Sequence, residues 1–246
     1  MVDRPAEDAA KTPLVLIPGL LCDERLWRHQ VERLTDLAYP VIADVTNSAS
    51  VSEMARAVLL VAPPAGRFAL AGLSMGGYVA LEILRVAPER VAGLALLDTS
   101  ARPDTPEQTA ARRELIELSR TGRFEEIPRG LFKKIVHPGR LDDAELADVV
   151  FGMAEAVGPE AFARQEEAII GRPDSREDLP KVACPTLALC GRGDALTPVH
   201  LHEEIVSLIP DSRLRVIENC GHLSTLERPV EVSAELRDWL KQIGSG

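Results

Sequence analysis

Short apolar runs alternate with longer segments of helical periodicity along the first hundred positions of the chain. The apolar runs are four to seven residues long, which fits buried strands, and the longer segments space apolar residues three and four positions apart, as amphipathic helices do. The runs lie at 14–17, 40–43, 67–71 and 91–97, and the periodic segments at about 24–37, 50–62 and 75–87. Because the runs are apolar throughout, the pattern predicts an α/β fold with a mostly parallel sheet covered by helices on both faces.

The pattern changes between residues 101 and 181, where no convincing strand is found. A structureless loop of this length would be unusual in a compact domain, so helices are expected here. They are predicted at 106–120, 124–135, 142–156 and 159–170, and the α/β pattern resumes with a strand at 185–190, a helix at 198–209, a strand at 213–217 and a helix at 229–243. We therefore expect a core domain made of residues 1–100 and 182–246, with a helical cap, or lid, inserted at residues 101–181.

Composition and charge narrow the class of protein. The 246 residues carry a formal net charge of −10 and have no basic patch beyond short pairs, which argues against nucleic acid and anionic membranes as partners. No apolar stretch is long enough to span a bilayer, and the polar segment 1–12 does not resemble a secretory signal. The four cysteines, Cys22, Cys184, Cys190 and Cys220, show no C-x-x-C spacing. We expect a cytoplasmic protein with free thiols.

The segment Gly72-Leu73-Ser74-Met75-Gly76 joins the third predicted strand to the helix after it. This is the G-x-S-x-G pattern of a nucleophile elbow, in the strand-turn-helix context that the motif requires. Such a tight turn holds the serine hydroxyl clear of the sheet, and side chains two residues away on either side would collide, which favours glycine there. We therefore expect Ser74 to be a nucleophile.

A serine hydroxyl needs a general base, and the base needs a carboxylate that orients it. In this topology the acid and then the histidine follow the serine along the chain. Only His222 follows the last predicted strand, and Gly221 before it lets the backbone turn toward the sheet edge. The other histidines are expected to be structural or solvated: His29 on the first helix, His137 in a cap loop, and His200 and His202 on a surface helix.

Asp194 is the expected acid. It lies in the loop after the strand that ends at Cys190, and the glycines at 191 and 193 free this loop to bring the carboxylate to the histidine. An aspartate here could instead cap a turn or the helix that Pro198 opens. Asp98, at the end of the preceding strand, is the alternative acid. Two backbone amides are expected to form an oxyanion hole, those of Met75 and of Leu20 in the loop after the first strand.

These motifs occur in the order of the α/β-hydrolase superfamily. The first loop Pro18-Gly19-Leu20, the elbow, the acid loop with Thr197-Pro198, and Gly221-His222-Leu223-Ser224 with Glu227 and Pro229 together resemble the 3-oxoadipate enol-lactonase and carboxylesterase branch. This resemblance implies a serine hydrolase that cleaves a small carboxylic ester or lactone through an acyl-enzyme, without a cofactor or metal. The expected partner is a small-molecule substrate, and the oligomeric state stays open.

The cap is expected to cover a small apolar pocket. Its candidate lining residues are Leu131, Phe132, Val150, Phe151 and Met153, and Trp27 is either a gate residue or a buried anchor of the first helix. Two other functions remain open. One is a carbon–carbon bond hydrolase of a vinylogous diketone, since such enzymes share the Ser-Met-Gly-Gly elbow. The other is a non-catalytic ligand-binding member of the fold.

Overall fold

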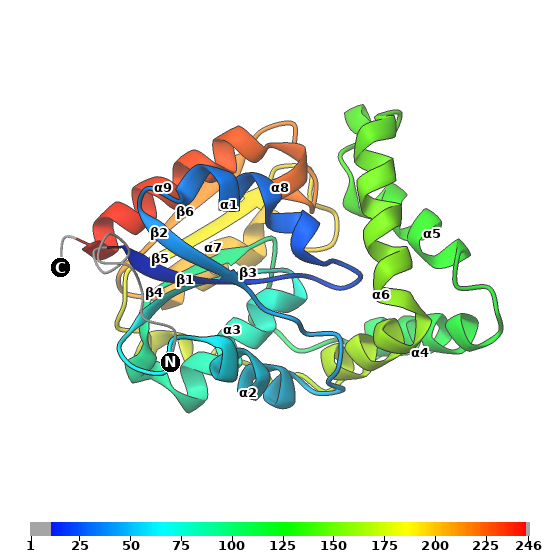
Figure 1. The fold of residues 1–246 in the computed structure, drawn as a ribbon. Helices are drawn as coiled ribbons and strands as arrows, with labels where there is room; N and C mark the ends of the chain where they lie inside the picture. The colour runs from blue at the N-terminus through cyan, green and yellow to red at the C-terminus, as the bar shows by residue number, and fades with distance from the viewer. Residues whose placement is uncertain (1–10, 245–246) are drawn as a thin grey trace.

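Six parallel strands form one sheet at the centre of the protein, in the order β2-β1-β3-β4-β5-β6 (Figure 1). The structure, a computed structural model, describes residues 11–244, so most of the predicted polar N-terminal segment lies outside it. The strands are β1 (Thr12–Ile17), β2 (Ala38–Ile42), β3 (Phe68–Leu73), β4 (Val91–Leu97), β5 (Thr186–Gly191) and β6 (Ser212–Ile217). Because all of them run in the same direction, the loops that leave their carboxyl ends gather at one edge of the sheet.

Each face of the sheet packs against its own group of helices. Leu14 and Leu16 of β1 belong to one apolar core, and Val15 and Ile17 belong to the other, as alternation along a strand requires. The first core lies under α1 (Arg28–Leu34) and α9 (Pro229–Gly244), and the second under α2 (Val51–Val61), α3 (Met75–Val86) and α7 (Val199–Leu208) (Figure 1). This three-layer arrangement confirms the predicted fold class.

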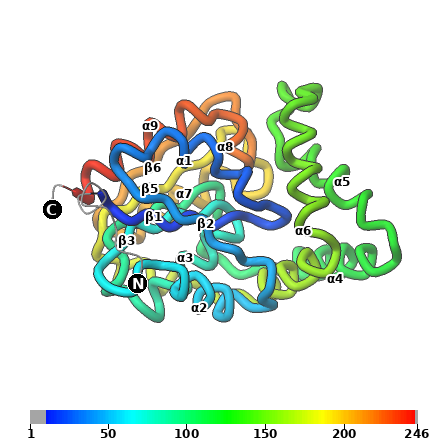
Figure 2. The backbone as a smooth tube through the Cα atoms, viewed as in Figure 1, coloured from blue at the N-terminus to red at the C-terminus, as the bar shows by residue number. Residues whose placement is uncertain are grey.

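Three helices between β4 and β5 form a separate group beyond the sheet (Figure 2). They are α4 (Pro106–Arg120), α5 (Glu126–Ile135) and α6 (Ala144–Ile170). The two segments expected at 142–156 and 159–170 are both helical and share the label α6. They are separated at Gly158, whose φ of 75° and ψ of 170° are not helical, and Pro159 follows it. Apolar residues of α5 and α6, among them Phe132 and Met153, join the core under α1 and α9, so this group packs directly on the sheet domain.

The first predicted helix is shorter and more irregular than expected. Asp23 accepts a hydrogen bond from the backbone amide of Arg25 and starts a 3₁₀ turn over Glu24–Trp27, and α1 follows and ends at Leu34. The remaining short elements are α8 (Ser224–Glu227) and 3₁₀ turns at Pro88–Arg90, Pro138–Arg140 and Leu179–Lys181. Among residues 11–244, no helix combines the length and the apolar composition that crossing a membrane requires.

Candidate active site

Ser74 occupies a strained turn between β3 and α3. Its φ of 55° and ψ of −115° lie in a region that residues with a side chain rarely adopt. The turn is possible only with glycine nearby, because a Cβ on Gly72 would lie 2.2 Å from the carbonyl oxygen of Gly76, and a Cβ on Gly76 would lie 2.2 Å from that of Ile17. The backbone thus holds the Ser74 hydroxyl at the carboxyl edge of the sheet.

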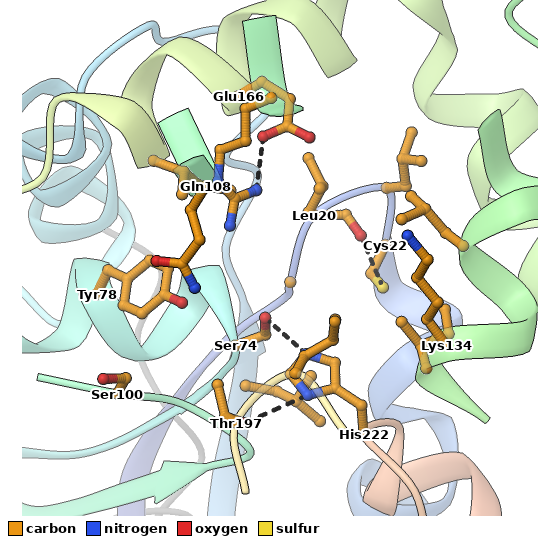
Figure 3. A pocket seen from close by; sticks show the side chains of 18 of the residues that line it. Leu20, Cys22, Ser74, Tyr78, Ser100, Gln108, Lys134, Glu166, Thr197 and His222 are labelled. Atoms are coloured by element: carbon orange, nitrogen blue, oxygen red, sulfur yellow. Dashed lines mark hydrogen bonds and ion pairs between the residues drawn. The ribbon is translucent and has the colours of Figure 1, made fainter. Parts of the chain in front are cut away.

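A hydrogen-bonded chain of three side chains starts at this hydroxyl. The Oγ of Ser74 lies 2.9 Å from Nε2 of His222, and Nδ1 of His222 lies 2.8 Å from Oδ2 of Asp194 (Figure 3 shows the first of these contacts). His222 and Asp194 are buried, whereas Ser74 is partly exposed. The structure therefore brings together the three residues that the sequence suggested as nucleophile, base and acid.

Asp194 is held by the loop between β5 and α7. Its Oδ1 accepts hydrogen bonds from the amides of Leu196 and Thr197, and its Oδ2 accepts one from the Thr197 hydroxyl at 2.6 Å. Burial alone would raise the pKa of Asp194, but the His222 partner and the Thr197 hydrogen bonds hold it well below its ordinary value. The carboxylate is therefore ionised at neutral pH. Asp194 thus does both things that the sequence allowed: it caps the turn of its own loop, and it faces the histidine.

The same pair sets the proton affinity of His222. Burial alone would lower the pKa of His222, but the charge of Asp194 and its hydrogen bond to Nδ1 outweigh burial and raise this pKa. With Nδ1–H directed at the carboxylate, Nε2 is left as the atom that accepts a proton from Ser74.

Glu227 supports the histidine loop, a role that sequence reasoning missed. Its Oε1 accepts hydrogen bonds from the amides of Gly221 and Leu223, and its Oε2 accepts one from the amide of His137. The amide of His222 itself donates to the carbonyl of Ile135 at the end of α5, at 2.7 Å. The histidine loop is therefore bound to the helical group above it.

Asp98, the alternative acid, does not bond to the histidine. It is fully buried with a φ of 45°, and its two carboxyl oxygens accept hydrogen bonds from the amides of Gly191 and Ser224, at 3.0 and 3.3 Å. Burial and the nearby Asp194 charge raise the pKa of Asp98. Asp98 thus joins the acid loop to the histidine loop, and Asp194 occupies the position facing Nδ1.

His202 differs from its expected solvated position. It is fully buried, and its Nε2 accepts a hydrogen bond from the Thr99 amide at 3.0 Å. Burial lowers the pKa of His202 to about 4, so the ring is neutral. The Thr99 hydroxyl in turn donates to the carbonyl of Ser74 at 2.8 Å, which links His202 to the nucleophile turn. Helical periodicity alone could not show that this side of α7 faces the sheet.

The two expected oxyanion donors lie beside Ser74. Met75 is the first residue of α3, where the amide has no acceptor within the helix. A Cβ on Gly19 would lie 3.4 Å from the Cβ of Ser74, which shows how closely the loop after β1 approaches the nucleophile. The loop hydrogen bonds found within residues 11–244 do not use the Leu20 amide. Leu21 follows with a φ of 59°, and its amide donates to Oε1 of Gln165 in α6.

A cavity of about 450 Å³ opens at Ser74 and His222, between the sheet edge and the helical group. Its apolar wall includes Leu20, Leu131 and Val150. Polar side chains also line it, and Figure 3 shows Tyr78, Ser100 and Gln108 on one side of Ser74 and Cys22 and Lys134 on the other. The charged lining residues are Arg102, Arg112, Lys134, Glu166, Arg172 and His222, the last of these when protonated.

The predicted pocket residues divide into two groups. Leu131 and Val150 line the cavity as expected, but Trp27, Phe132, Phe151 and Met153 do not. Trp27 and Met153 are fully buried in the core shared with α1 and α9, and the Phe132 and Phe151 rings contact each other at 5.2 Å between centroids. These large side chains anchor the helices to the sheet domain, so they are not available to line the cavity.

Comparison with known proteins agrees with this architecture. A model of the alpha/beta hydrolase family matches residues 14–235. The chain belongs to this family. Among its relatives, a pimeloyl-[acyl-carrier protein] methyl ester esterase from Aromatoleum aromaticum is 31% identical over 179 residues, which cover 68% of this chain and 71% of that protein.

The chain also resembles solved structures, among them an esterase and an enol-lactonase. A thermophilic esterase from Thermogutta terrifontis, solved with malate bound, has a TM-score of 0.87 and 32% identity, and covers 95% of this chain and 90% of its own. The enol-lactonase from Burkholderia xenovorans LB400 has a TM-score of 0.84 over 94% of this chain and 92% of its own, but only 20% identity, so this likeness concerns the fold. The chain is thus an alpha/beta hydrolase with esterase homologues, and the family predicted from its motifs is confirmed.

Proposed function

We propose that this alpha/beta hydrolase is a serine hydrolase that cleaves a small carboxylic ester or lactone through an acyl-enzyme. The observation that carries the proposal is the unbroken chain from Ser74 Oγ through His222 to Asp194, with hydrogen bonds of 2.9 and 2.8 Å. Such a chain makes a serine hydroxyl nucleophilic at neutral pH, which an isolated serine is not.

In the first half of the reaction, Ser74 Oγ attacks the carbonyl carbon of the ester while Nε2 of His222 takes its proton. The negative charge that develops on the carbonyl oxygen is stabilised by the amides of Leu20 and Met75, and the start of α3 adds its dipole. Asp194 holds the His222 tautomer and stabilises the imidazolium. The intermediate collapses when His222 gives its proton to the leaving alkoxide, and an alcohol departs from a Ser74 ester.

The second half repeats these steps with water. His222 removes a proton from a water molecule as its oxygen attacks the acyl carbon, and then returns this proton to Ser74 Oγ as the ester bond breaks. The products are a carboxylic acid and the free enzyme. With a lactone, the alcohol and the acid are two ends of one opened chain.

The size of the cavity supports a small substrate. A volume of about 450 Å³ is within the range of small-molecule sites, and helices α4 to α6 cover it. The esterase and enol-lactonase structures that share the fold are consistent with ester and lactone substrates.

The test combines covalent labelling with turnover. A fluorophosphonate should label the wild-type protein and not Ser74→Ala, while Ser207→Ala, which changes an exposed serine on α7, should be labelled like the wild type. The turnover panel contains p-nitrophenyl esters from acetate to octanoate, several lactones and one vinylogous diketone. Ser74-dependent hydrolysis of an ester or lactone is the expected result.

Three outcomes would contradict the proposal. Cleavage of the diketone alone would indicate a carbon–carbon bond hydrolase. Absence of both labelling and turnover would indicate a ligand-binding protein. Turnover retained in folded Ser74→Ala would exclude the mechanism itself.

A further inference from the structure

Both backbone polar groups of Ser74 are bonded to the end of β4 and the loop after it. The Ser74 amide donates to the carbonyl of Leu97 at 2.9 Å, and the Ser74 carbonyl accepts a hydrogen bond from the Thr99 hydroxyl at 2.8 Å. We propose that Thr99 and His202 are positioning residues that hold Ser74 in its reactive geometry, with His202 acting through Thr99. This role deepens the proposed function and rests on it, because Ser74 is the nucleophile of that reaction.

Ser74 needs support from its surroundings because its own backbone conformation is unfavourable. A residue with a side chain rarely adopts its φ of 55° and ψ of −115°, and such a conformation persists only where neighbouring groups fix it. Inside the turn, the Ser74 carbonyl accepts a hydrogen bond from the amide of Gly77 at 2.9 Å. The Thr99 hydroxyl reaches the same carbonyl from a different segment of the chain, and it therefore ties the turn to the sheet domain.

Thr99 fits against this turn because residue 77 is glycine. A Cβ on Gly77 would lie 2.4 Å from the Thr99 hydroxyl oxygen and 2.7 Å from both Cβ and Cγ2 of Thr99, closer than such atoms approach in proteins. Gly77 lies inside α3, where the backbone does not demand glycine, and it is not one of the two glycines of the G-x-S-x-G pattern. The close packing of Thr99 explains why a second glycine follows Gly76.

His202 fixes the backbone of Thr99 in turn. Because β4 has ended at Leu97, the Thr99 amide has no strand partner, and it donates instead to Nε2 of His202 in α7, at 3.0 Å. Both residues are fully buried, so bulk water does not replace this acceptor. Burial lowers the pKa of His202 to about 4, and the neutral ring leaves Nε2 free to accept while Nδ1 carries the hydrogen.

Neither of the two side chains reaches the substrate. Thr99 and His202 do not line the cavity at Ser74, and the contact between His222 and Asp194 does not involve them. Their loss should therefore change where the Ser74 hydroxyl lies relative to Nε2 of His222 and to the oxyanion donors. Such a misplacement lowers kcat steeply, whereas the binding of the substrate, measured by KM, should change little.

The first test replaces the Thr99 hydroxyl with a group of similar size. Thr99→Val puts a methyl group where the hydroxyl donates to Ser74, and Thr99→Ser keeps the donor as the matched variant. We expect kcat of Thr99→Val for an ester to fall about 10- to 100-fold, with KM and the kcat of Thr99→Ser within about threefold of wild type. The kcat is expressed per active site, counted by fluorophosphonate labelling carried to completion, so that unfolded protein does not enter the rate.

The second test removes the acceptor of the Thr99 amide. His202→Met leaves this buried amide without an acceptor, whereas the side-chain oxygen of His202→Gln reaches the position of Nε2. We expect kcat to fall about 10- to 100-fold in His202→Met and to recover most of this loss in His202→Gln. His200→Met makes the same change at an exposed position of α7, and it should keep the wild-type kcat.

The double variant Thr99→Val/His202→Met tests whether His202 acts through Thr99. With Thr99→Val already in place, the contact that His202 supports is gone, so the double variant should lose little more kcat than the more damaging single variant. Residues that contribute independently show losses that multiply. Multiplying losses would therefore overturn the route through Thr99.

The other possible results separate this role from the proposed function. A kcat per active site within about threefold of wild type in both Thr99→Val and His202→Met would overturn the positioning role, even with a loss of thermal stability. A shift of more than about one pH unit in the acid limb of kcat/KM would also overturn it, because the effect would then lie at His222. A wild-type protein that neither reacts with the fluorophosphonate nor hydrolyses an ester would contradict the proposed function itself, and the positioning role with it.

Discussion

Gln165 in α6 accepts a hydrogen bond from the backbone amide of Leu21, which lies 144 residues earlier in the chain. The Gln165 side chain is fully buried, and the distance from Oε1 to the amide nitrogen is 3.1 Å. Leu21 has a φ of 59°, a strained conformation for leucine, and the preceding residue carries one of the two expected oxyanion donors. A helix of the inserted group therefore holds the loop on which the Leu20 amide is presented.

Replacing Gln165 should weaken catalysis more than substrate binding. In Gln165→Leu the Leu21 amide would lose its acceptor, and the loop would no longer hold the Leu20 amide toward the developing charge. Loss of a whole oxyanion donor typically costs about 10²–10³ in kcat, so we expect a fall of about 10- to 100-fold with little change in KM. The kcat from steady-state kinetics and the affinity for a trifluoromethyl ketone inhibitor should fall in parallel.

The control for this variant is Glu167→Leu, which also introduces a leucine into α6 but at an exposed position. It should retain wild-type kcat. A folded Gln165→Leu protein with kcat within about twofold of wild type would show that the loop keeps its position without this contact.

Asp194 and Asp98 should respond very differently to the same change. Asp194→Asn removes the partner that orients His222 and should lower kcat by about 10³–10⁴-fold. Asp98→Asn leaves the histidine partner in place and alters only hydrogen bonds to two loop amides, so the main expected effect is a loss of about 1–3 kcal/mol in the free energy of unfolding. Steady-state kinetics gives kcat for both variants, and denaturant unfolding gives their free energies of unfolding. A larger loss of kcat in Asp98→Asn than in Asp194→Asn would make Asp98 the catalytic acid instead.

The pH dependence of activity should follow His222. The imidazole acts as a base only when neutral, and the Asp194 charge raises its pKa in the folded protein. Activity should therefore rise with pH through a midpoint above the ordinary histidine value of about 6.5. The acid limb of log kcat/KM for a neutral ester gives this midpoint directly, and a midpoint below 6 would contradict the described electrostatics.

Two glycines should differ in their tolerance of alanine. A Cβ on Gly72 would lie 2.2 Å from a backbone oxygen, so Gly72→Ala should distort the nucleophile turn and lower both stability and activity. Gly130 lies in α5 with no atom near its would-be Cβ, so Gly130→Ala should stabilise the protein by about 0.5–1 kcal/mol. Thermal unfolding of the two variants tests the contrast, and a Gly72→Ala protein as stable and active as wild type would contradict it.

Elements with strong local signals could be predicted closely. The helix expected at 106–120 matches α4, because Thr105, Pro106 and Gln108 form a capping box with proline in the first turn. The strand at 91–97 matches β4, since an apolar run after a proline break leaves few alternatives. The bounds of the helix expected at 24–37 were predicted less closely. The segment begins as a 3₁₀ turn, which the contact between the Asp23 side chain and the Arg25 amide starts.

Burial by distant segments could not be predicted in this way. His202 was expected in solvent and lies under Thr99, and Phe132 and Met153 were expected in the pocket but pack against the sheet domain. In each case the periodicity shows that a helix has two sides, but the neighbours that cover each side come from another part of the chain.

The order and type of the elements, the nucleophile turn and the candidates Ser74, Asp194 and His222 were determined by the sequence itself. They depend on backbone preferences and motifs within a few residues, such as the glycines that allow a tight turn. Only the tertiary structure decided that Asp194 faces His222 while Asp98 joins two loops, and that Gln165 holds Leu21. These relations depend on how segments more than a hundred residues apart pack together, and that packing is set by the whole fold.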